Sequence, residues 1–313
     1  MKFLERTFET QNQFWKYLVV VLGGFLGGQF LGAIPLSIVV AVHTFRNGGI
    51  AAGLDPSNPT DLSAFGLSSN AGLALMLLPF VFSLILIVFL IRQLHRRSFA
   101  DTVNGGRKIR FKRIAMGAYV WGILLGLYLV IDYMMFPETY HFQLDWTTFI
   151  PLIFIALLLI PIQTTTEELI FRGYLSQGVG VLTNNRWLAL IVPGVLFALM
   201  HCMNPEVREF GFWISMTQYL FFGLLFGAIA IFDDGIELTL GMHAVNNVFL
   251  SLFVTHDASA LQTNAVFQAT AINPNKEAIV LILSGVLAFA FFARYYTWNF
   301  RLPTKIKTPF SEP

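Results

Sequence analysis

Long apolar runs separated by short polar connections dominate the chain. Runs near the ~20 residues that a helix needs to cross a bilayer occur around 17–42, 71–91, 115–136, 148–171, 187–203, 211–232, 236–255 and 279–297. Prolines interrupt the fourth run and the short fifth run, so the ends of these two are the least defined. The pattern predicts an all-α, polytopic protein of about eight transmembrane helices, with 1–313 as a single membrane domain.

Composition agrees with lipid as the main solvent of the chain. Of its 313 residues 56% are hydrophobic and 12% are charged, with a mean hydropathy of +0.66. Such a chain has too few charges to cover a water-soluble domain of this size. The net charge of +2 gives no indication of a nucleic-acid partner. The single cysteine, Cys202, excludes an intramolecular disulfide and is interpreted as a small packing residue.

Positive residues are distributed unevenly between the connections. The segment after the second run contains Arg92, Arg96, Arg97, Arg107, Lys108, Arg110, Lys112 and Arg113. Such a block favours the cytoplasm, and alternation then places both chain ends on the same side. The longest outer loops, near 43–70 and 256–278, are too short for a soluble domain. Short loops and the lack of sorting signals favour a prokaryotic plasma (inner) membrane.

Several other positions have ordinary structural interpretations. Glycines in the first run give two GxxxG spacings, which predict close helix packing: Gly23, Gly24, Gly27 and Gly28. Charges at a tight turn with Gly235 are interpreted as solvated: Asp233, Asp234 and Glu237. Asp132 is expected to be interfacial, and His95 lies at a span end where it needs no special explanation.

Two carboxylates and a guanidinium interrupt the fourth run. An ionised side chain at the centre of a spanning helix costs about 2.5–3.5 kcal/mol, so each such residue needs a partner, a wet cavity or a function. Glu168 and Arg172 stand at i and i+4, where they can form an ion pair. Glu167 is left without a cation on its own helix. A carboxylate in this setting is a candidate general base for the activation of water.

Two histidines lie inside apolar runs. His201 follows Phe197 by one helical turn, and His243 precedes Asn247 by one turn, so His243 and Asn247 share a helix face. A single buried histidine is most often a satisfied core residue. Two of them, together with Asn247 and the glutamates of the fourth run, favour a shared polar site in a cavity of the bundle.

These residues resemble the CAAX protease and bacteriocin-processing enzyme family (CPBP), a group of intramembrane glutamic endopeptidases. The family motifs EExxxR, FxxxH and HxxxN read here as Glu167 to Arg172, Phe197 to His201 and His243 to Asn247. All three occur in the family order. The resemblance covers a core of about 148–255, and hydropathy alone supports the remaining spans.

The resemblance implies that Glu167 activates the attacking water with help from His201. His243 and Asn247 would stabilise the oxyanion, while Glu168 and Arg172 would orient these groups. The expected activity is hydrolysis of a peptide bond near the membrane, as in CAAX prenyl proteases. The expected partners are membrane lipid and a protein or peptide substrate, prenylated or otherwise membrane-anchored, and no nucleic acid.

No cofactor is expected, but zinc remains an alternative. His201, His243 and Glu167 form a plausible metal-ligand set with the second glutamate as base. The chain has no HExxH spacing, and the resemblance favours the glutamate mechanism without a metal.

Two other functions remain open. Intramembrane Glu, His and Arg also occur in proton-coupled transporters, although the motif helices show no inverted repeat here. A non-catalytic, bacteriocin-immunity-type member of the family is the other alternative, and the intact motifs argue against it.

One geometric difficulty concerns the depth of the site. Counting residues places Glu167 and His243 in the cytoplasmic third of the membrane. His201 follows Arg186 by 15 residues, which at 1.5 Å per residue puts it nearer the opposite side. Either the helix that carries His201 enters the membrane late, or the site is deeper than the count suggests.

Overall fold

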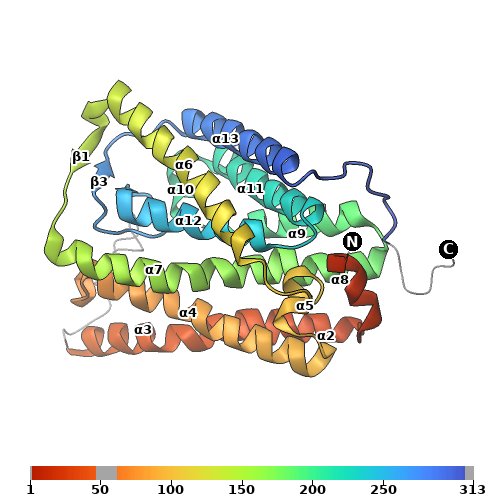
Figure 1. Cartoon of the computed structure of the whole chain (residues 1–313). Coiled ribbons are helices and arrows are strands. Elements are labelled where there is room, and N and C mark those ends of the chain that lie inside the picture. Colours follow the sequence, from red (N-terminus) through yellow and green to blue (C-terminus); the bar gives the residue numbers. More distant parts are fainter. Residues whose placement is uncertain (1, 47–61, 307–313) are drawn as a thin grey trace.

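The computed structural model describes residues 2–46 and 62–306, so most of the predicted loop at 43–70 lies outside the described residues. The long helices run side by side, with strands β1 (Tyr140–Phe142) and β3 (Phe267–Ala269) at one end and the N-terminus at the other (Figure 1). We call these the sheet end, formed by 140–142, 254–255 and 267–269, and the basic end, formed by 92–113.

Helices make up most of the described residues. The α-helices are α1 (Lys2–Glu5), α2 (Phe14–Val19), α3 (Gly27–Arg46), α4 (Ser69–Leu90), α5 (Phe99–Asn104), α6 (Phe111–Met135), α7 (Trp146–Glu168), α8 (Ser176–Thr183), α9 (Arg186–Met200), α10 (Pro205–Phe210), α11 (Phe212–Phe232), α12 (Glu237–Phe253) and α13 (Pro274–Tyr295). Three π-helical segments extend them: Val20–Leu26, Ile91–His95 and Leu169–Leu175. Short 3₁₀ turns occupy Arg6–Glu9, Ser63–Phe65 and Pro137–Thr139.

A small sheet closes one end of the bundle. Strands β1 (Tyr140–Phe142), β2 (Val254–Thr255) and β3 (Phe267–Ala269) are arranged in the order β1-β3-β2. β1 pairs antiparallel with β3, whereas β2 pairs parallel with it. The sheet therefore ties the connection after α6 to the long connection between α12 and α13.

The membrane fold agrees with the hydropathy pattern. Six helical stretches among the described residues are long and apolar enough to cross a membrane: 14–46, 69–95, 111–135, 146–183, 212–232 and 274–295. The other two predicted spans also contain helices, α9 and α12, but these have only 15 and 17 residues. At 1.5 Å per residue they are about 22 and 26 Å long, shorter than a bilayer core of ~30 Å. The all-α polytopic fold is confirmed, with two short helices inside it.

The fourth span is much longer than its apolar run. α7, the π-helical segment after it and α8 form one continuous helical stretch of 38 residues, Trp146–Thr183, whereas the hydropathy pattern predicted an end near residue 171. Its length of about 57 Å exceeds the thickness of the bilayer core. The stretch therefore extends well past the apolar layer.

Helices α6 and α12 cross at a pair of glycines. A Cβ added at Gly241 would lie 1.9 Å from the carbonyl oxygen of Ile114, and one at Gly117 would lie 2.2 Å from that of Leu238. Without a hydrophobic driving force between helices in lipid, such close backbone contact is a main source of association. This crossing fixes α12, which carries His243 and Asn247.

We expect Gly241→Ala to destabilise the protein strongly. The new methyl group must displace backbone atoms of α6, and overpacking of this kind costs about 1–3 kcal/mol or more. Thermal unfolding in detergent measures the effect. Gly126→Ala is the matched control, because nothing lies within 4 Å of a Cβ at that position of α6. Equal melting temperatures for the two variants would contradict the close crossing.

Of the two predicted GxxxG spacings in the first span, the pair Gly24 and Gly28 packs closely, against α4, and the pair Gly23 and Gly27 does not. Added Cβ atoms at Gly28 and Gly32 would lie 2.3 Å from Cα atoms of α4, and one at Gly24 would lie 3.2 Å from the side chain of Ile87. Gly23 and Gly27 meet nothing closer than 3.5 Å. The contact face is therefore the series 24, 28 and 32.

Two of the three acidic residues at the turn between α11 and α12 are buried, contrary to the interpretation from sequence, whereas Asp234 is half-buried. Asp233 is 3% exposed and Glu237 is fully buried. Arg110 pairs with both carboxylates, and Arg113 pairs with Asp233. Arginines of the basic end therefore pair with buried carboxylates and anchor the start of α12.

Two further polar residues are more buried than the sequence indicated. Asp132 is 5% exposed and binds Lys276 at 2.7 Å and the hydroxyl of Tyr140 at 2.7 Å. His95 is fully buried, and its ring contacts the Tyr174 hydroxyl at 2.7 Å. The first group ties α6 to α13 near the sheet, and the second fixes the end of the α4 stretch against the fourth span.

Candidate active site

Glu168 is the centre of a buried polar cluster. One of its oxygens, Oε1, accepts hydrogen bonds from Nη1 of Arg172 at 2.8 Å and from Nδ1 of His243 at 2.9 Å. The side chain of Thr239 lies close to the same carboxylate, although its hydroxyl donates to the carbonyl of Ile236. The i, i+4 pair predicted from sequence is therefore present, and it reaches α12.

The guanidinium of Arg172 packs against the aromatic rings of Phe197 and Phe226. Its guanidinium carbon lies 3.9 Å from the ring centroid of Phe197, a cation–π contact that favours a desolvated cation. Its Nη2 donates to the carbonyl of Phe222 at 3.3 Å. The phenylalanine of the FxxxH motif thus covers the positive charge of the EExxxR motif.

Glu167 lies beside this pair and makes different contacts. Its Oε1 accepts from Nε2 of Gln163 at 2.8 Å. Its Oε2 lies 3.6 Å from Nε2 of His243 and has no hydrogen-bond partner among the described residues. The second oxygen of Glu168 is also unpartnered among them, but that side chain is fully enclosed. Glu167 therefore presents an oxygen with free acceptor capacity beside His243.

His201 reaches the same cluster from the end of α9. Its Nδ1 lies 2.7 Å from the carbonyl oxygen of Phe197. A carbonyl only accepts, so Nδ1 carries the proton, and Nε2 is the acceptor of the neutral ring. The Phe197 ring connects the two histidines, with its centroid 4.5 Å from that of His201 and 6.1 Å from that of His243.

The predicted difference in membrane depth between Glu167 and His201 disappears when the fourth span is measured to its last residue, Thr183. Glu167 lies 16 residues before Thr183, or about 24 Å along the helix. The chain turns at Asn184–Asn185, and α9 returns 15 residues from Arg186 to His201, or about 22 Å. The two distances match, so His201 returns to the level of Glu167.

A tyrosine that was not selected from the sequence supports His201. Tyr219 on α11 stacks on the imidazole, with centroids 4.5 Å apart and planes at 26°. Its hydroxyl accepts from the amide of Asn204 at 3.0 Å and donates to Glu206 at 3.3 Å. Burial raises the pKa of the Glu206 carboxyl, which lies outside the spanning helices. The α9–α10 turn thus holds the histidine ring in place.

Asn247 joins the cluster through Gln163. Its Nδ2 donates to Oε1 of Gln163 at 3.2 Å, while its Oδ1 accepts from Asn246 at 3.0 Å. Gln163 was not selected from the sequence, although it precedes Glu167 by one helical turn in an apolar run. That spacing is the signal that could have identified it.

The cluster has a closed side and a more open side. Arg172 is 2% exposed and Glu168 is fully buried, whereas His201 and Asn247 are only half-buried. The structure thus brings all six predicted side chains into one connected group. His201 and Asn247 are therefore its most exposed members.

The zinc alternative can be compared with this geometry. No three His, Cys, Asp or Glu side chains within 2–46 and 62–306 are arranged to hold a metal ion. Two tetrahedral zinc ligands at 2.1 Å lie about 3.4 Å apart, close to the 3.6 Å between His243 and Glu167. Because Nδ1 of each ring is held by its own partner, Nε2 of His201 and Nε2 of His243 are the nitrogens that would bind a metal.

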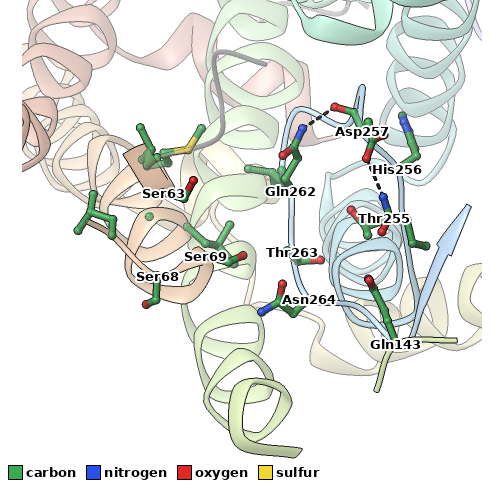
Figure 2. Close-up of a pocket in the computed structure, with 17 residues that line it drawn as sticks. Ser63, Ser68, Ser69, Gln143, Thr255, His256, Asp257, Gln262, Thr263 and Asn264 are labelled. Carbon is green, nitrogen blue, oxygen red and sulfur yellow. Dashed lines mark hydrogen bonds between the residues drawn. The ribbon is translucent and has the colours of Figure 1, made fainter. Parts of the chain in front are cut away.

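A separate polar cavity lies at the sheet end. Its volume is about 260 Å³, and its lining includes Ser68, Ser69, Thr255, His256 and Asn264 (Figure 2). None of the six cluster residues lines it. Apolar side chains of α4 and α7, including Leu77 and Leu152, pack in the adjoining part of the bundle. This cavity is distinct from the candidate active site.

Comparison with known proteins gives the family. Residues 146–249 match a family described as Rce1-like, type II CAAX prenyl endopeptidase. The chain is 31% identical over 293 residues to the uncharacterized protein YyaK of Bacillus subtilis (strain 168), covering 93% of this chain and 95% of that protein. No solved structure matches. The matched region contains all six residues of the cluster, and the chain belongs to the CPBP family of Rce1-like CAAX prenyl endopeptidases.

Proposed function

We propose that this protein is a membrane-embedded endopeptidase in which Glu167 activates water against a peptide bond near the membrane. Family membership supports a CAAX protease-like hydrolase. The observation that carries the finer proposal is the free oxygen of Glu167, which is buried, unpartnered among the described residues and 3.6 Å from His243. A water molecule at this oxygen is correctly placed to lose a proton.

The proposed hydrolysis uses the side chains of this cluster. Oε2 of Glu167 takes a proton from water while the water oxygen bonds to the carbonyl carbon of the substrate. Nε2 of His201 accepts a hydrogen bond from the other hydrogen of that water. Negative charge then develops on the carbonyl oxygen. When the carbon–nitrogen bond breaks, Glu167 returns its proton to the leaving amine.

The remaining groups are suited to stabilise that charge. Two carboxylates and one guanidinium leave the cluster with one uncompensated negative charge, which protonation of His243 would balance. Glu168 holds the Nδ1 proton of this ring, so the imidazolium can direct its Nε2 proton at the oxyanion. Nδ2 of Asn247 has a second hydrogen for the same purpose. Donors in a dry site are worth more than donors in water.

The proposed setting follows the charge distribution. In this proposal the positive block of the basic end faces the cytoplasm, and both termini are on that side of a prokaryotic plasma membrane. We propose that the substrate is a protein or peptide with a membrane anchor, which brings the scissile bond to the depth of Glu167. The reaction as written requires no metal or other cofactor.

Cleavage of a defined probe in proteoliposomes tests the proposal. The probe is an internally quenched peptide that ends in a CAAX box, prepared with and without a farnesyl group on its cysteine. We expect cleavage within the CAAX box, unaffected by EDTA and 1,10-phenanthroline. Loss of cleavage with a chelator and recovery with zinc would instead support the metal alternative. Failure to cleave either peptide, with solute flux into the same vesicles, would support a transporter.

A further inference from the structure

A chain of four hydrogen bonds runs from the core of the bundle to the proposed catalytic carboxylate. The indole Nε1 of Trp121 donates to Oδ1 of Asn246 at 3.0 Å, and Nδ2 of Asn246 donates to Oδ1 of Asn247 at 3.0 Å. Nδ2 of Asn247 donates to Oε1 of Gln163 at 3.2 Å, and Nε2 of Gln163 donates to Oε1 of Glu167 at 2.8 Å. Three helices, α6, α12 and α7, contribute to it.

The two ends of this chain leave only one possible direction. An indole can only donate, and an ionised carboxylate can only accept. Side-chain amides can usually be turned over by exchanging oxygen and nitrogen. Here the fixed donor, Trp121, which is 1% exposed, requires the oxygen of Asn246 to face it. The carboxylate of Glu167 requires the nitrogen of Gln163 at the other end, so all three amides are oriented.

We propose that Trp121, Asn246 and Gln163 are positioning residues that orient Asn247 and Glu167 for hydrolysis. The chain occupies the oxygen of Asn247, so this amide offers only its second N–H to the substrate. It also occupies Oε1 of Glu167 and leaves Oε2 as the base. The proposal rests on the proposed function, because it assigns these two tasks to Asn247 and Glu167.

The most informative substitution is Asn246→Asp, which reverses the direction of the hydrogen bonds and keeps the shape of the side chain. In Asn246→Asp both side-chain oxygens accept, so Asn247 must turn its nitrogen toward residue 246. Gln163 then has to donate to Asn247, and its own oxygen faces the carboxylate of Glu167. Trp121→Phe removes the fixed donor but forces no reversal. We therefore expect a larger loss of kcat in Asn246→Asp than in Trp121→Phe.

Kinetics with the farnesylated CAAX probe in proteoliposomes form the first arm of the test. Trp121→Phe should lower kcat about tenfold, as expected for the loss of one hydrogen bond, with KM within about twofold. Asn246→Asp should lower kcat further. Trp298→Phe is the matched control, because its indole also donates a hydrogen bond, to Asp233 at the far end of α11. An unchanged kcat in Asn246→Asp, or a loss confined to KM, would overturn the proposal.

A second arm does not depend on catalysis. In protein labelled with ¹⁵N-tryptophan, the indole signal of Trp121 is assigned by its disappearance in Trp121→Phe. Glu167→Gln and Gln163→Met should each move this signal and leave that of Trp298 in place. A Trp121 signal that stays fixed in both variants would refute the chain. If wild-type protein cleaves no probe but the signal moves, the proposed function fails while the hydrogen-bond chain stands.

Discussion

Glu167→Gln is expected to lower kcat for the probe peptide by about 10²–10⁴-fold, the range that a general base contributes. Glutamine keeps the shape of the side chain and can still accept from Gln163, but it cannot take a proton from water. The fold should therefore persist. Initial rates in proteoliposomes, together with the melting temperature in detergent, separate loss of chemistry from loss of structure.

A half-buried glutamate outside the cluster provides the control for this prediction. Glu277 on α13 is hydrogen-bonded to the hydroxyl of Tyr128, away from the cluster. Glu277→Gln makes the same chemical change within the bundle and should keep activity within about twofold of wild type. Wild-type turnover by purified Glu167→Gln would remove Glu167 from the reaction.

Arg172→Met is expected to destabilise the protein by about 3–5 kcal/mol, because it leaves a buried carboxylate without its main cation. The side chains of Arg172 and Glu168 are 1% and 0% exposed, and their ion pair measures 2.8 Å. The cation–π contact with Phe197 is lost as well. Denaturant or thermal unfolding in detergent gives the magnitude.

The double variant Glu168→Gln with Arg172→Met tests the cause of that loss. Removing both charges leaves no uncompensated ion, and the amide oxygen can still accept from His243. We expect it to be more stable than Arg172→Met alone, although inactive or nearly so. If the double variant is no more stable than the single one, the guanidinium acts by packing and not by neutralising Glu168.

The spacing of residues along a helix predicted those contacts of the cluster in which both residues belong to the same helix. The separation of four residues between Glu168 and Arg172 gave the ion pair, and the same separation placed His243 and Asn247 on one face. Hydropathy also gave the membrane fold. These features are local, because the period of one helix decides them.

Features that depend on contacts between different helices could not be predicted in this way. The hydropathy pattern ended the fourth span near 171, since polar residues follow, whereas packing under α1 and α5 extends the helix to Thr183. This error produced the difference in depth between His201 and Glu167 that residue counting predicted. Likewise, nothing in the sequence indicates that Trp121 on α6 faces Asn246, or that Tyr219 stacks on His201. Such contacts follow from helix crossings at glycines such as Gly241.

The most direct test of the central claim compares membrane-protein termini in cells that carry the wild-type protein with those in cells that carry Glu167→Gln. Mass spectrometry of protein ends detects cleavage of any membrane protein, whichever one is the substrate. If Glu167 is the base of a peptidase, a set of shortened C-termini or membrane-proximal ends is present with wild type and absent with the variant. Identical termini in the two strains, at equal levels of folded protein, would contradict a peptidase role for this site.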